Sequence, residues 1–170
     1  FFTAVQSLRI SGKGFTPQIA SLQYLPSGNT ILVSDDHSRL FLYDINTEKE
    51  KWSYSVEENS YFAVYIDDVR NDGRECLITR RLQRTGGDTA LSIHSTESGS
   101  LLGTLHEKSS YYYKPAANAL AEDLRGETMI AVSACYSEDG GKFYVVWRNM
   151  KMTHGMYDFK LTCHNAYNYK

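Results

Sequence analysis

Short apolar runs separated by polar turn residues recur along the chain, and they are easiest to follow in residues 30–56. There the apolar runs 31–34 and 40–43 flank a polar turn cluster at 35–38. Apolar residues and serines then alternate from Trp52 to Val56, which is the period of a β-strand. This stretch therefore predicts three strands joined by two tight turns.

The same order of strands and turns returns twice, which divides the chain into units at about residues 17–56, 60–105 and 115–163. Tyr43, His94 and Trp147 take the same place in the three units, and they are 51 and 53 residues apart. A repeat of this length with four short strands is typical of a propeller blade. We therefore predict an all-β fold made of β-propeller blades, each with four antiparallel strands.

The third unit follows the pattern less closely than the first two. Phe143 to Trp147 is expected as its third strand and Met156 to Cys163 as its fourth strand. Its first strand is expected within residues 111–124, although residues 115–122 have a composition that favours a helix. Residues 3–11 form one more candidate strand, for which the sequence gives no evident partner.

A family resemblance supports the propeller interpretation. Residues 26–44 resemble the core of a blade in the WD-repeat and quinoprotein-like β-propeller superfamily. Tyr43-Asp44 stands in place of the Trp-Asp pair of that family, Asp36 in place of its tight-turn aspartate, and Trp52 in place of an outer-strand Trp. In the second and third units His94-Ser95 and Trp147-Arg148 replace the pair. The resemblance implies a propeller that binds other proteins on its faces.

The number of predicted blades raises a question of completeness. At 170 residues the chain suits a single domain, 1–170, with a sizeable core. Three blades and a spare strand cannot close a ring, because propellers usually contain four to eight blades. The chain also begins without Met. We therefore expect it to be incomplete or to be completed by a partner chain. A β-sandwich with a similar number of strands is the alternative fold.

Composition excludes some classes of protein. A formal net charge of −2 argues against a general nucleic-acid binder, which is usually basic. No apolar run approaches the length of a membrane span, and no signal peptide is evident. The three cysteines are an odd number, are widely spaced, and are expected to be buried free thiols. Together with the absence of Asn-x-Ser/Thr acceptors, this favours an intracellular, cytoplasmic protein.

One acidic stretch has the character of a metal-binding motif. Residues 67–75 resemble the cation loop of integrin-type propeller repeats, in which carboxylates bind calcium. Asp68, Asp72 and Glu75 are the candidate ligands here. Arg70, however, stands where a middle oxygen ligand is needed, and its charge repels calcium. The favoured interpretation is therefore an acidic hairpin turn, in which Asp and Asn side chains form hydrogen bonds with their own backbone. Calcium binding is the alternative.

Two further features are candidates for a protein interface. The aromatic run Tyr111-Tyr112-Tyr113 has the character of a loop, and tyrosine anchors are enriched at interfaces. Five arginines form a local basic cluster that we expect to be solvated surface charge or to contact phosphate or an acidic partner; they are Arg70, Arg74, Arg80, Arg81 and Arg84. We predict that Tyr111, Tyr112, Tyr113 and Arg81 are the contacts to other proteins.

No nucleophile elbow, phosphate-binding loop or dinucleotide-binding motif occurs in the sequence. We therefore expect a non-enzymatic propeller scaffold that mediates protein–protein interaction within a larger assembly and needs no cofactor. Two alternatives remain open. One is a quinoprotein-like enzyme or ligand-binding propeller, and the other is an adhesion-type propeller that binds calcium.

Overall fold

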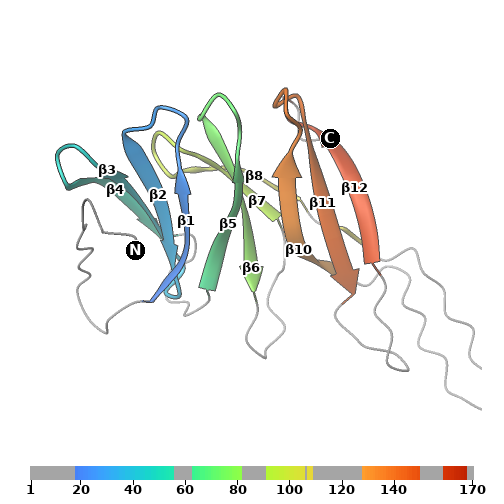
Figure 1. Cartoon of the computed structure of the whole chain (residues 1–170). Coiled ribbons are helices and arrows are strands. Elements are labelled where there is room, and N and C mark those ends of the chain that lie inside the picture. Colours follow the sequence, from blue (N-terminus) through green and yellow to red (C-terminus); the bar gives the residue numbers. More distant parts are fainter. Residues whose placement is uncertain are drawn as a thin grey trace, which may run out of the picture.

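The computed structural model describes residues 18–55, 63–81, 91–105, 107–108, 128–149 and 159–167, without the side chains of residues 80, 81, 107, 108, 128 and 149. Every regular element in these ranges is a β-strand, and the twelve strands form three four-stranded antiparallel sheets. Figure 1 shows the three sheets standing side by side. The predicted all-β fold is confirmed. No helix in the described part of the chain could cross a membrane.

The first sheet follows the predicted order of four strands joined by tight turns. It consists of β1 (Ile19–Tyr24), β2 (Thr30–Asp35), β3 (Arg39–Asp44) and β4 (Lys49–Ser55), and neighbours in the chain are neighbours in the sheet. The second sheet repeats this order with β5 (Ala63–Val69), β6 (Glu75–Arg81), β7 (Leu91–Ser95) and β8 (Leu101–Leu105).

The third sheet is arranged differently. It has the order β12-β11-β10-β9, from β9 (Glu107–Lys108), β10 (Thr128–Tyr136), β11 (Lys142–Asn149) and β12 (Phe159–Asn165). The two-residue strand β9 pairs only with the start of β10. The strand expected within 111–124 and the candidate strand 3–11 lie outside the described residues.

A shared turn identifies which strands of the three sheets are equivalent. Gly28, Gly73 and Gly140 each have a positive φ, of 75°, 71° and 67°. Each glycine N–H donates to the carbonyl three residues earlier, at 2.9, 2.7 and 2.8 Å. The strands that precede these turns are β1, β5 and β10, and each of them is also irregular in register against its partner. The first strand of the third sheet is therefore β10.

This equivalence corrects one sequence-based assignment. Trp147 lies on β11, the second strand of its sheet, and was wrongly predicted to match Tyr43 and His94. Ile45, Thr96 and Ala166 each donate a backbone N–H to the first turn of their own sheet, to Asn29, Arg74 and Gly141. The true match to Tyr43 and His94 is therefore His164, two residues before Ala166. The connection that leads into β10 is longer than the one that leads into β5, so the strands of the third sheet come later in the sequence than a regular repeat predicts. The bounds of the three predicted units stay a prediction.

Apolar side chains join each sheet to the next. Strand β5 lies against β1 and β2, and β10 lies in the same way against β5 and β6. Leu32, Leu40 and Leu42 of the first sheet pack with Val64 and Ile78 of the second. The next junction contains larger groups, because Leu91 and Ile93 meet Phe143, Val145 and Trp147. Burying each such side chain contributes about 1.5–3 kcal/mol to stability, so these junctions hold the sheets together.

Two side-chain predictions in the fold need correction. The tight turn after β2 is closed by the buried Asp35, not by Asp36: Asp35 Oδ1 accepts the N–H groups of His37 and Arg39 at 2.9 and 3.0 Å. The neighbouring Asp36 accepts the N–H of Gln18 instead. Of the cysteines, only Cys76 is buried, whereas Cys135 and Cys163 are exposed. Both exposed thiols lie on the side of the third sheet that faces away from the second.

Candidate protein-interaction surface

The turns between the first and second strands of the three sheets, the turns between the third and fourth strands of the first two sheets, and the turn after β12 lie at one end of the described sheets (Figure 1). We call this surface the turn face. The two kinds of turn are tied together by the backbone hydrogen bonds from Ile45 to Asn29, Thr96 to Arg74 and Ala166 to Gly141, of 2.9, 3.0 and 3.0 Å. The turn face comprises residues 26–29, 45–48, 71–74, 96–98, 138–141 and 166–167.

Neighbouring turns of the turn face also contact one another. Asn71 Nδ2 donates to the carbonyl of Glu138 at 2.9 Å, which joins the second sheet to the third. On the other side, a Cβ atom at Gly73 would lie 3.1 Å from the Pro26 ring of the first sheet. The three turns therefore form one continuous surface, in which the turn of the second sheet is central.

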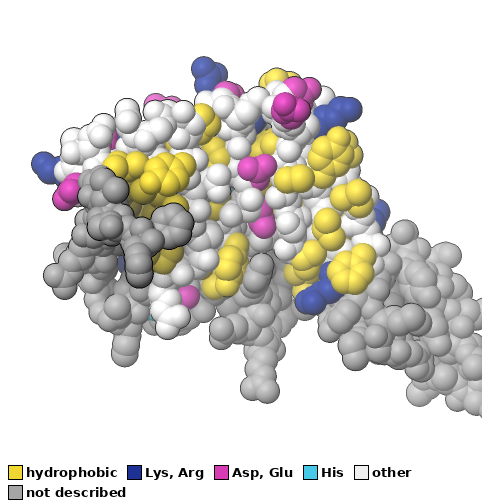
Figure 2. Space-filling model, in the orientation of Figure 1, with side chains coloured by type: hydrophobic (Ala, Val, Ile, Leu, Met, Phe, Trp, Pro, Cys, Tyr) yellow, Lys and Arg dark blue, Asp and Glu magenta, His cyan; other side chains and the backbone are white. Residues whose placement is uncertain are grey.

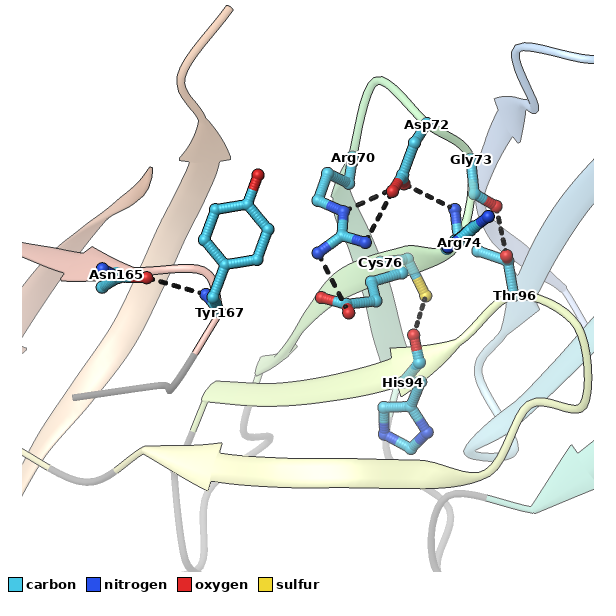
Figure 3. Close-up of polar contacts among 10 residues, drawn as sticks. Arg70, Asp72, Gly73, Arg74, Cys76, His94, Thr96, Asn165 and Tyr167 are labelled. Carbon is cyan, nitrogen blue, oxygen red and sulfur yellow. Dashed lines mark hydrogen bonds and ion pairs between the residues drawn. The ribbon is translucent and has the colours of Figure 1, made fainter. Parts of the chain in front are cut away.

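A buried arginine holds this central turn in shape. Arg70 is only 8% exposed, and its Nε and Nη2 donate to both carboxylate oxygens of Asp72 at 2.9 and 2.6 Å (Figure 3). Its Nη1 lies 3.1 Å from Glu75 Oε1. These hydrogen bonds lower the pKa of Asp72 and raise that of Arg70. The prediction of solvated surface charge is therefore wrong for Arg70.

The aromatic ring of Tyr167 completes the surroundings of Arg70. The ring centre lies 5.9 Å from Arg70 Cζ, within the range of a cation–π contact. Tyr167 itself is exposed, and its backbone N–H donates to Asn165 Oδ1 at 2.8 Å. Figure 3 shows this ring facing the guanidinium from the third sheet. Arg70 thus links the second and third sheets on the turn face.

The candidate calcium ligands do not converge on one point. Asp72 and Glu75 both bind the Arg70 guanidinium, which lies between them. Asp68 Oδ2 instead accepts the N–H of Tyr136 on β10, at 2.8 Å. The stretch forms the hairpin turn between β5 and β6. Among the described residues, no group of three or more His, Cys, Asp or Glu side chains is arranged to hold a metal ion. Calcium binding stays a prediction.

The predicted interface residues are mostly beyond what the structure describes. Tyr111, Tyr112 and Tyr113 lie outside the described residues. Arg81 is the last residue of β6, but its side chain is not described. Their role in protein binding stays a prediction.

The turn face contains a groove that the sequence analysis did not find. It has a volume of about 770 Å³ and lies between the first and second sheets. Apolar side chains and charged side chains both line it; among them are Leu25, Leu42, Trp52 and Leu102, and Lys51, Arg74 and Glu97. Trp52, Arg74 and Glu75 were noted in the sequence for other reasons, but no sequence pattern indicated a groove, because its residues come from separate strands and turns that meet only in the folded chain.

Solved structures with a similar arrangement of strands identify the fold. The β-propeller domain of Cps50 (Swd1) from Myceliophteria thermophila superimposes with a TM-score of 0.51, at 13% sequence identity. The chain has the β-propeller fold. The match covers 91% of this chain but only 42% of that one, so the chain spans less than half its length. No family model matches the sequence, and no curated protein matches it.

Proposed function

We propose that this chain is a non-enzymatic β-propeller scaffold that binds other protein subunits within a larger assembly. The observation that carries the proposal is the continuous turn face with its groove of about 770 Å³. Binding residues are often found on loops held by a rigid scaffold, and the Arg70 ion pairs and the turn-to-turn contacts supply that rigidity here. A fold alone does not determine a function, so the proposal depends on this surface.

The chemistry of the groove suits a protein segment. Its walls combine a half-buried Trp52 and the exposed Leu102 with charged side chains at the rim. Trp and Arg are enriched among the residues that dominate binding energy at protein interfaces. Trp52 offers the apolar anchor, and the exposed Arg74 and Glu97 offer polar contacts of both signs around it. We infer that a partner inserts an apolar side chain beside Trp52.

A charge reversal with a matched control tests the groove. The tagged full chain is purified from its native cells, and the proteins that it retains are identified by mass spectrometry. We expect Arg74→Glu to weaken retention of the partner about tenfold, because it removes a contact at the groove rim. Lys142→Glu makes the same change of charge on the third sheet, away from the groove. Equal losses in both variants would show a general effect of charge and would contradict the groove.

The aromatic run contributes a second part of the proposal. We propose that Tyr111, Tyr112, Tyr113 and Arg81 are further contacts to the partner subunits. Replacing the three tyrosines with alanine in the full chain is expected to weaken copurification of the partner. Unchanged copurification of a correctly folded triple variant would rule these tyrosines out as contacts.

A further inference from the structure

The first two sheets differ in the chemistry of their outermost strands. Strands β4 and β8 end the strand order of these sheets, on the side away from β1 and β5. β4 carries Lys49, Glu50 and Lys51, and charges of this kind protect an edge strand against pairing with another chain. β8 has the sequence Leu-Leu-Gly-Thr-Leu, without a charged residue or a proline. The edge of β8 is therefore the less protected of the two.

The edge of β8 is apolar and open. Leu101 and Leu102, at the start of the strand, are 48% and 44% exposed. Charged side chains of both signs lie along the turn face (Figure 2), but β8 adds none. Within the described ranges β7 is the only strand beside β8, so backbone N–H and C=O groups on the other side of β8 are left for another strand. An apolar edge strand of this kind is a template for strand pairing.

The exposure of this edge does not depend on where the sequence begins or ends. Each sheet packs on the next through its side, since β5 lies against β1 and β2, and β10 against β5 and β6. A further sheet before the first or after the third would pack in the same way and leave the edge of β8 as it is. The chain also leaves this edge at once, because Glu107, two residues after β8, pairs with Met129 of the third sheet. The connections after β4, β6 and β9 begin and end at the opposite end of the sheets from the turn face.

The groove of the turn face reaches β8 as well. Leu102 of β8 lines the groove together with Lys51 and Trp52 of β4. Arg74 and Glu97 also line it and are exposed, and neither side chain forms an ion pair with another part of the chain that the structure describes. Side chains of a strand alternate between its two sides. A strand that pairs with the edge of β8 can therefore direct every second side chain towards the groove.

We propose that a partner protein adds a β-strand to the edge of β8 and places an apolar side chain of that strand in the groove beside Trp52. Main-chain hydrogen bonds to β8 provide affinity in this mode of binding, and the side-chain pocket provides specificity. The strand also carries an acidic group that faces Arg74 and a basic group that faces Glu97. The inference rests on the proposed scaffold function and names the kind of segment that the partner presents.

A second copy of this chain fits the same edge less well. From a strand about 17 Å long and a sheet about 10 Å thick, two β8 edges would bury roughly 350 Å² in all, whereas stable interfaces bury about 1,200 Å² or more. The β8 strand of a second copy also has no charge to offer Arg74 or Glu97. Its flanks are held in its own fold, because Gly99 packs on Trp52 and β9 pairs with β10. They are therefore not free to fill a groove.

Hydrogen–deuterium exchange tests strand addition directly. It is measured on the full chain alone and on the complex that the tagged chain retains from its native cells. Unpaired N–H groups of an edge strand exchange quickly, so the added strand is expected to slow part of the amides of residues 101–105 about tenfold or more. Residues 49–55 of β4 are the control and should not change. Unchanged exchange at 101–105 in the complex would overturn the proposal. Complete protection of these amides in the chain alone would also overturn it, because the same polypeptide or a second copy would then cover the edge.

Substitutions separate this inference from the scaffold function itself. Thr104 is exposed on β8 and does not line the groove. Thr104→Lys is expected to weaken retention of the partner about tenfold, because a lysine on an edge strand opposes pairing. Ser53→Lys adds the same charge to the exposed side of β4 and should leave retention unchanged, and urea unfolding checks that both variants are folded. If Arg74→Glu lowers retention but Thr104→Lys does not, the scaffold function stands and strand addition is wrong. If the unchanged chain retains no protein, both proposals fall.

Discussion

Gly99, in the turn between β7 and β8, lies against the six-membered ring of Trp52 on β4, so that a Cβ atom at position 99 would be 2.6 Å from the indole. The same atom would be 2.7 Å from Tyr54 Cβ. Gly99 also has a φ of 73°, which residues with a side chain rarely adopt. The second sheet thus fits onto the outermost strand of the first through a position that has room for no side chain.

We predict that Gly99→Ala lowers the free energy of unfolding by about 2–4 kcal/mol, from the positive φ and the added crowding together. Urea unfolding followed by Trp fluorescence measures the change. Gly28→Ala is the matched control, because Gly28 has a similar φ of 75° but nothing within 4 Å of the added atom. It should cost only about 1 kcal/mol. Equal costs for the two variants would mean that the Trp52 contact does not constrain Gly99.

The second prediction concerns the buried guanidinium of the turn face. Arg70→Met keeps most of the apolar stem but leaves the Asp72 and Glu75 carboxylates without their cation. We expect the free energy of unfolding to fall by about 3 kcal/mol, the low end for a broken buried ion pair, because Asp72 is partly hydrated. Arg74→Met is the control and should change it by less than about 0.5 kcal/mol, since Arg74 is exposed. Chemical denaturation at neutral pH gives both values.

The pH dependence of stability follows from the same ion pair. Hydrogen bonding to Arg70 lowers the pKa of Asp72 below its ordinary value of 3.8. A carboxyl whose pKa is lower in the folded state stabilises the fold above its unfolded pKa, and that contribution is lost as the pH falls through the folded value. Stability should therefore decline below about pH 4. The decline should be smaller in Arg70→Met, which urea midpoints measured from pH 5 to pH 2.5 would detect. An identical decline in both proteins would contradict this role for Asp72.

The cysteines should differ in reactivity. Burial raises the pKa of the Cys76 thiol to about 12, so almost no thiolate is present at neutral pH. Cys135 and Cys163 are exposed. We predict that a thiol reagent such as DTNB at pH 8 modifies these two quickly in the folded protein and Cys76 only after unfolding. The variant Cys76→Ser should retain the fast reaction in full. A fast reaction of all three thiols would mean that the second sheet opens readily.

The strands of the first two sheets could be predicted from the sequence, because each apolar run ends at a turn residue. The third sheet could be predicted only in part. The regular spacing of Tyr43, His94 and Trp147 favoured an alignment that the fold does not have. The glycines of the first turns, Gly28, Gly73 and Gly140, were the better markers, since the backbone of that turn needs a positive φ. Spacing alone cannot reveal a connection of unequal length.

The interaction surface could not be predicted in the same way. Arg70 stands among acidic residues in a turn, a pattern that normally indicates hydrated charge. Its burial depends on Tyr167, almost one hundred residues later in the chain, and on the packing of neighbouring turns. The groove beside Trp52 likewise needs residues from six separate segments. Such relationships come from tertiary packing and leave no local pattern in the sequence.

The uneven spacing of the three first turns has a structural consequence. Strand β10 sits on β5 and β6 as β5 sits on β1 and β2, although the chain that leads into β10 is much longer. The packing of one sheet against the next is thus determined by the side chains between them and not by the length of the connecting segment. Connections of different length therefore lead to the same packing of one sheet on the next.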